Sequence, residues 1–144
     1  MKKLLILFLF AGLVFSTTSC KKKESCPEPE VWGVGDWQAT KVVVNGSEQS
    51  SSDPQIACLL THQMSLTDSW GGNWQYHYYD NNTSSCETIP LVFDSWLEDI
   101  DKKILVVNFT YNSNKYSFKF DYVDDSHFHW MLGSNNTYME FTKQ

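Results

Sequence analysis

Apolar and polar residues alternate along several short stretches of the chain, which is the pattern of β-strands with one buried face. In the clearest stretch, aromatic residues occupy every second position from Tyr116 to Tyr122, and polar residues lie between them. Similar alternation runs through residues 58–67 and 73–79. No segment after residue 20 keeps a sustained helical period. The pattern therefore predicts an all-β domain.

Turn residues such as Asn45-Gly46 and Trp70-Gly71-Gly72-Asn73 separate eight predicted strands. The strands are expected at residues 37–44, 58–67, 73–79, 91–96, 103–111, 115–122, 127–132 and 137–142. Residues 45–55 are expected to form a polar surface loop, and 94–101 is the one stretch where a helical turn is the alternative. Short connections favour antiparallel neighbours, and closing eight strands removes exposed sheet edges. We therefore predict a single eight-stranded antiparallel up-and-down barrel.

Length and charge narrow the class of protein. A chain of 144 residues suits one domain. The net charge is −6, and all eleven basic residues are lysines. Nucleic-acid-binding surfaces need concentrated basic side chains, commonly with arginine forks. We therefore predict no nucleic-acid partner.

The N-terminus has the form of an export signal. Met1-Lys2-Lys3 is positively charged, and Leu4–Phe15 is an apolar run too short to span a bilayer. Small residues then precede Cys20, which resembles the lipobox of bacterial lipoproteins, where the cysteine is acylated. The predicted parts are a lipoprotein signal peptide at 1–19, lipidated Cys20 with a flexible tether at 20–31, and a barrel domain at 32–144. The alternative is ordinary secretion with a free Cys20 thiol.

Acylation of Cys20 would make a membrane the first partner of the protein, and several acyl chains make such an attachment stable. Lys21-Lys22-Lys23 suits a solvated spacer, and contact with anionic head groups is the alternative. An aspartate directly after Cys20 would resemble a signal for inner-membrane retention, but Lys21 stands at that position. We therefore expect an outer-membrane lipoprotein of a Gram-negative cell envelope, with its periplasmic or surface face left open.

The chain has four cysteines: Cys20, Cys26, Cys58 and Cys86. No C-x-x-C pair occurs, so zinc-ribbon and thioredoxin-like sites are not predicted. In an oxidising compartment Cys58 and Cys86 are the natural disulfide pair, because a hairpin folded about the 70–73 turn would place them opposite each other. The alternatives are that this pair stays reduced, and that Cys26 is free or forms an intermolecular bond.

The order of these features resembles the small lipocalin-like lipoproteins of Gram-negative bacteria. Gly35-Asp36-Trp37 matches the Gly-x-Trp motif that opens the first strand in that family, and Val42–Gly46 is similar to the end of that strand and its turn. Cysteines near Cys58 and Cys86 are also similar, and Ser95-Trp96 partly repeats the motif. The resemblance covers roughly residues 33–143. It implies a barrel closed at one end by Trp37, with something bound in or on it, but no particular ligand.

Residues suited to metal binding or catalysis are few. His127 and His129 share one strand face, but no third ligand points to them. His62 and His77 lie on neighbouring predicted strands, where they can approach each other. Asp124-Asp125 is explained by turn formation better than by paired-carboxylate catalysis. We expect solvent-facing histidines and predict no enzyme activity, no metal and no cofactor.

Aromatic side chains are the strongest remaining signal. The candidate ligand-binding residues are Trp37, Trp74, Tyr76, Tyr78, Tyr116, Phe118, Phe120 and Trp130. Tyr and Trp combine an apolar body with a polar group, which suits a small apolar or amphipathic ligand inside the barrel. The alternative is that the inner aromatics fill the barrel as core. In that case Trp70, Trp74 and Tyr79 near the 68–73 turn would form an exposed patch for a glycan or a protein.

Overall fold

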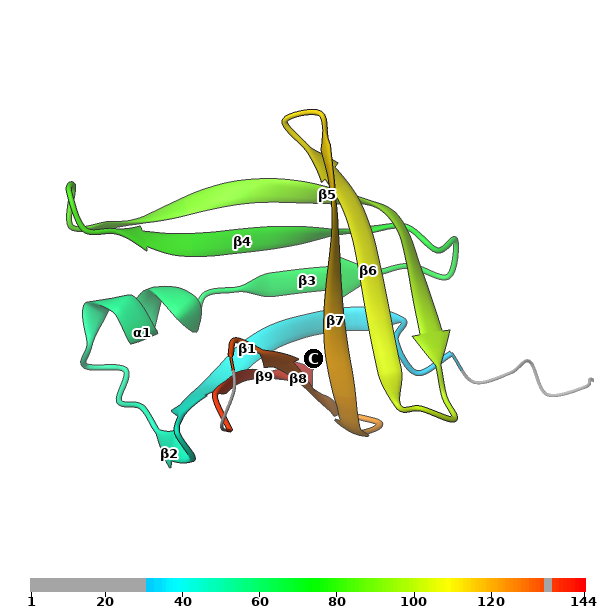
Figure 1. The fold of residues 1–144 in the computed structure, drawn as a ribbon, viewed down its shortest axis with the longest axis horizontal. Helices are drawn as coiled ribbons and strands as arrows, with labels where there is room; N and C mark the ends of the chain where they lie inside the picture. Colours follow the sequence, from blue (N-terminus) through cyan, green and yellow to red (C-terminus); the bar gives the residue numbers. More distant parts are fainter. Residues whose placement is uncertain (1–30, 134–135) are drawn as a thin grey trace, which may run out of the picture. The chain divides into compact units, whose positions relative to one another are not determined.

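The computed structural model describes residues 31–133 and 136–144, and most of them lie in one β-sheet (Figure 1). The barrel strands are β1 (Gly35–Val44), β3 (Gln63–Leu66), β4 (Gly72–Asp80), β5 (Ser85–Asp99), β6 (Ile104–Tyr111), β7 (Asn114–Asp124), β8 (His127–Met131) and β9 (Tyr138–Lys143). The predicted signal peptide, Cys20, Cys26 and the tether up to residue 30 lie outside the described residues.

The sheet closes on itself. Each barrel strand pairs antiparallel with the next one along the chain, and β9 pairs back onto β1. This confirms the predicted all-β, eight-stranded, up-and-down barrel. Among the described strands, β2 (Ser47–Glu48) stands outside the barrel and folds back on the end of β1. The turn between them uses Asn45 and Gly46 at φ values of 51° and 79°, the conformation that a two-residue hairpin loop favours.

Two strands bend so that each follows a different neighbour along its two halves. β5 pairs with β4 up to Phe93 and with β6 from there to Asp99, and its register shifts between Phe93 and Ser95. β1 pairs with β3 along residues 35–38 and with β9 along residues 37–43, and its register shifts between Ala39 and Lys41. A bulge bends and twists a strand locally, so these shifts let the sheet curve into a barrel (Figure 1).

The strand predicted at 58–67 begins instead with a helix. Helix α1 (Pro54–Leu59) starts at Asp53, whose carboxylate accepts hydrogen bonds from the backbone N–H groups of Gln55 and Ile56. Pro54 stands at the first position of the helix, where its missing N–H costs nothing because that N–H would have no partner within the helix. This capping outweighs the short alternation read from Cys58 onward, so β3 starts only at Gln63.

Strand β5 is longer than the strand predicted at 91–96. Its first half contains Pro90, a residue that is rare inside paired strands, so the pattern there resembles a loop. The helical turn considered for 94–101 is wrong, because β5 continues to Asp99. The loop predicted at 45–55 contains β2 and the start of α1.

Aromatic side chains fill the barrel. The largest fully buried ones are Trp37, Trp74, Trp96, Phe120, Phe128 and Phe141. The rings of Phe128 and Phe141 stack with centroids 5.1 Å apart, and Phe120 meets Phe128 edge-on at 5.0 Å. These residues therefore form the core that the sequence offered as the alternative to a lined pocket.

The segment before β1 crosses one end of the barrel, which we term the closed end. The Trp37 indole N–H donates to the backbone oxygen of Gly33 at 2.9 Å, and the Trp32 ring meets Tyr122 edge-on. A Cβ on Gly33 would lie 3.0 Å from both the Trp96 ring and the Tyr122 hydroxyl, so a side chain there would force its neighbours apart. The segment before β1 therefore packs over Trp37 and the core at this end of the barrel.

Cys58 and Cys86 form the predicted disulfide, with their Cα atoms 5.4 Å apart. The predicted geometry is wrong, however. The turn at 70–73 joins β3 to β4, whereas Cys86 lies on β5 opposite Tyr79, and Cys58 lies in α1. The bond therefore fastens α1 to the β4–β5 hairpin.

Removing this bond in the double variant Cys58→Ser/Cys86→Ser should lower the free energy of unfolding by about 3 kcal/mol, because the unfolded chain regains conformational freedom. Urea unfolding followed by tryptophan fluorescence measures the loss. The β-sheet circular dichroism should persist in the native variant, because no barrel strand pairing uses the bond. A double variant as stable as the parent would contradict the structural role of the disulfide.

Candidate functional site

An apolar hollow opens at the end of the barrel opposite the closed end, and we term it the apolar cup. Its volume is about 220 Å³, and its lining residues are Tyr76, Ile89, Leu91, Phe109, Tyr111, Tyr116 and Phe118. They come from the middle of β4, the first half of β5, the end of β6 and the start of β7. Antiparallel pairing brings these four strand segments to the same end of the sheet.

Stacked rings form one wall of the cup. Phe109 on β6 and Tyr116 on β7 are cross-strand partners, and their rings stack with centroids 5.4 Å apart and planes 18° from parallel. Phe118 lies 5.2 Å from Phe109. Because cross-strand aromatic pairs fix each other's orientation, this wall is preformed.

The barrel core forms the floor of the cup. The Trp130 ring lies 5.1 Å from Phe118 and 5.0 Å from the fully buried Trp74. Trp74 also contacts Phe118 edge-on at 5.5 Å. The cup therefore ends on packed rings and is shallow.

The polarity of the lining limits what the cup can hold. None of its seven residues is charged. Tyr111 and Tyr116 are 37% and 42% exposed, so their phenol rings are accessible both to water and to the cup. This arrangement can take up the apolar end of a molecule and hydrogen-bond a polar group outside it.

His62 is a buried polar residue beside the cup, and its ring meets Tyr76 edge-on at 5.0 Å. Its Nδ1 accepts a hydrogen bond from the indole N–H of Trp74 at 3.0 Å, which places the imidazole proton on Nε2. Nε2 has no hydrogen-bond partner among the described residues. Burial, and then the charge of His77, lower the pKa of His62 to about 3, while the backbone of His77 acts in the opposite direction. His62 is therefore neutral at neutral pH.

The other histidines lie apart from the cup lining. The His77 ring lies 5.7 Å from the His62 ring, so these two do approach, but the expectation of solvent exposure is wrong for His62. His127 pairs with Asp124 at 2.8 Å, and His129 pairs with Glu140 at 3.0 Å. Within residues 31–133 and 136–144, no three histidine, cysteine or acidic side chains converge as a metal site would require.

The structure separates the predicted ligand-binding residues into three groups. Tyr76, Tyr116 and Phe118 line the cup, and Trp130 lies beneath it. Trp37, Trp74 and Phe120 are fully buried in the core. Tyr78 lies outside the cup lining and is 40% exposed.

Four cup residues were not predicted: Ile89, Leu91, Phe109 and Tyr111. Phe109 and Tyr111 occupy alternate positions of the strand predicted at 103–111, so pairing that strand with the Tyr116 strand would have found them. Ile89 precedes Pro90 in the part of β5 that resembled a loop, and no sequence pattern marks it.

The exposed aromatic patch expected near the 68–73 turn is reduced to one residue. Trp74 is fully buried and Tyr79 is half-buried. Trp70 is 50% exposed, and its ring lies 5.0 Å from that of Trp96.

Comparison of the chain with protein-family models, curated proteins and solved structures finds no match. Among the described residues, no helix has the length and apolar character needed to cross a membrane.

The variant His62→Asn tests the burial of the histidine, because its amide oxygen can accept the Trp74 N–H while the titrating ring is removed. In the parent, the unfolded chain binds a proton at His62 below about pH 6.5, whereas the folded protein does so only near pH 3. The free energy of unfolding therefore falls as the pH drops through this window, by up to about 1.4 kcal/mol per pH unit. The stability advantage of the parent over the variant should shrink as the pH falls.

Urea unfolding of both proteins at pH 7.5, 6.0, 5.0 and 4.0 measures this difference, and carboxylates that titrate in both proteins cancel from it. A difference that stays constant with pH would show that His62 is not held neutral.

Proposed function

We propose that the protein is a lipid-anchored lipoprotein of a Gram-negative outer membrane, with a lipocalin-like binding domain. The domain binds the apolar end of a small apolar or amphipathic ligand in the cup, and no catalytic step is part of this role. The observation that carries the proposal is an uncharged, aromatic hollow at the open end of a closed eight-stranded barrel.

The size of the cup supports partial insertion of the ligand. Its volume of about 220 Å³ is below the range of roughly 300–1,000 Å³ typical of pockets that enclose a drug-sized molecule. The buried Trp74 and its neighbours block deeper entry. A ring or a short alkyl end enters, each buried methylene contributes about 0.8 kcal/mol, and the polar part stays outside.

Tyr116→Ala removes half of the stacked wall and should weaken the binding of an apolar probe, N-phenyl-1-naphthylamine, about tenfold. The reason is the loss of roughly 1.4 kcal/mol of apolar contact. Fluorescence titration of the full-length protein measures the dissociation constant.

Two variants control this experiment. Tyr116→Phe keeps the wall and should bind the probe as the parent does. Tyr78→Ala removes another exposed tyrosine outside the cup lining and should have no effect. Equal binding by the parent and Tyr116→Ala would refute the cup as the site.

The anchor is tested separately, because Cys20 lies outside the described residues. Cys20→Ser removes the thiol that acylation needs, so the protein should move from the membrane fraction to the soluble fraction and lose incorporated radiolabelled palmitate. Cys26→Ser is the matched control and should stay membrane-bound. Palmitate incorporation that persists in Cys20→Ser would contradict the predicted lipidation site.

A second candidate function is a filled-barrel lipoprotein that binds a protein or a glycan through exposed loop aromatics. The half-exposed Trp70 over Trp96 favours it. Loss of partner binding in Trp70→Ala, together with unchanged probe binding in the cup, would distinguish it.

A further inference from the structure

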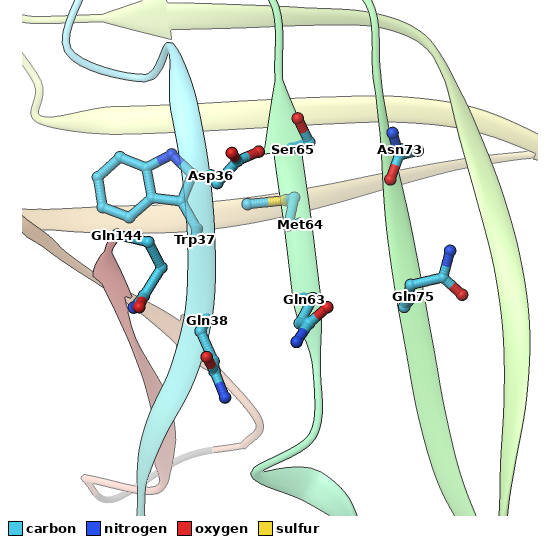
Figure 2. Close-up of a pocket in the computed structure, with 9 residues that line it drawn as sticks. All are labelled: Asp36, Trp37, Gln38, Gln63, Met64, Ser65, Asn73, Gln75 and Gln144. Atoms are coloured by element: carbon cyan, nitrogen blue, oxygen red, sulfur yellow. The ribbon is translucent and has the colours of Figure 1, made fainter.

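A second hollow lies on the outer face of the barrel, across β1, β3 and β4 (Figure 2). Its volume is about 410 Å³, and its lining residues are Asp36, Trp37, Gln38, Gln63, Met64, Ser65, Asn73, Gln75 and Gln144. Trp37 and Met64 are buried, so the polar side chains define its surface. We term this hollow the amide groove, and it shares no lining residue with the apolar cup.

Strand register arranges six of these side chains in two rows, which Figure 2 shows one above the other. Asp36, Ser65 and Asn73 are cross-strand neighbours and form the first row. Gln38, Gln63 and Gln75 form the second. Neighbouring strands lie about 4.8 Å apart, so each row presents hydrogen-bonding groups at short, regular intervals.

The hydrogen-bonding capacity of the two rows is free for a ligand. Within the described part of the chain, none of the six side chains forms a hydrogen bond with another residue. Each amide offers both donors and acceptors, and the Asp36 carboxylate adds acceptors. Asn and Asp are uncommon inside strands, so strand propensity does not account for this composition.

Charge indicates the kind of ligand. Among the described residues, Asp36 is the one charged side chain that lines the groove, in a chain with eleven lysines and seventeen acidic residues. The described lining contains no lysine that could neutralise phosphates or a polyanion. A protein-docking surface would need an apolar centre, whereas the exposed apolar residue here, Val92, lies at the margin opposite Asn73.

We propose that the amide groove binds an uncharged glycan chain. Amides paired along a row can donate to and accept from neighbouring hydroxyls of one sugar, and the Asp36 carboxylate accepts from a hydroxyl. Val92 and Pro90, opposite Asn73 and Gln75, offer an apolar edge for the C–H face of a sugar ring. The site is independent of the cup, so the two proposals stand or fall separately.

Native gel electrophoresis of the full-length protein tests this inference, with galactomannan, arabinoxylan, mixed-linkage β-glucan or dextran cast into the gel. At least one of these neutral polysaccharides should retard the protein, and anionic polygalacturonate should not. Gln63→Ala/Gln75→Ala should raise the dissociation constant for the retarding polysaccharide at least about tenfold, because two sets of hydrogen bonds are lost.

Two control variants make the result specific to the groove. Gln49→Ala/Gln55→Ala removes two glutamines outside the groove lining and should bind as the parent does. Tyr116→Ala, in the cup, should also leave glycan binding unchanged. Thermal unfolding of the two double glutamine variants should match that of the parent, because the substituted glutamines are not buried.

Three results would overturn the inference. They are no retardation by any of the four neutral polysaccharides, equal retardation of the parent and Gln63→Ala/Gln75→Ala, and binding that is lost in Trp70→Ala but kept in the double glutamine variant. The last result would place the glycan on the loop aromatics instead.

Discussion

The indole of Trp74 lies in the middle of the aromatic core, where its ring contacts Tyr76, Phe118, Phe120, Trp130 and Phe141. A buried N–H needs an acceptor, and the Nδ1 atom of His62 supplies one only while the imidazole is neutral. The packing of Trp74 in the core is thus linked to the protonation state of His62. The interior is filled as a result, and the two hollows described above lie at the open end and on the outer face of the barrel.

The two hollows differ in chemistry because they use opposite faces of the same sheet. Residues of β4 alternate between the two surfaces, so Tyr76 lines the cup while its neighbour Gln75 lines the groove. The inner face gives aromatic walls without charge. The outer face gives amides held at fixed spacing by strand register. One barrel therefore presents an apolar and a polar surface without an extra domain.

Much of the fold could be predicted, because alternation such as that from Tyr116 to Tyr122 directly reflects a sheet with one buried face. The prediction failed where local chemistry overrides alternation, as at the Asp53 cap of α1 and at Pro90 in β5. Three of the seven cup residues followed from the same alternation. The remaining cup residues depend on which strands meet at the open end of the barrel. The amide groove depends on the pairing registers of β1, β3 and β4. Neither is visible along a single strand.

The pairing of β1 with β9 joins residues far apart in the chain, as the 2.8 Å hydrogen bond between the Thr40 and Thr142 hydroxyls shows. Contacts of such large sequence separation slow folding. Until β9 has been synthesised the barrel stays open, and β1 and β8 expose unpaired edges that can pair with neighbouring chains. The closed architecture therefore leaves the incomplete chain with aggregation-prone strand edges until its last strand is in place.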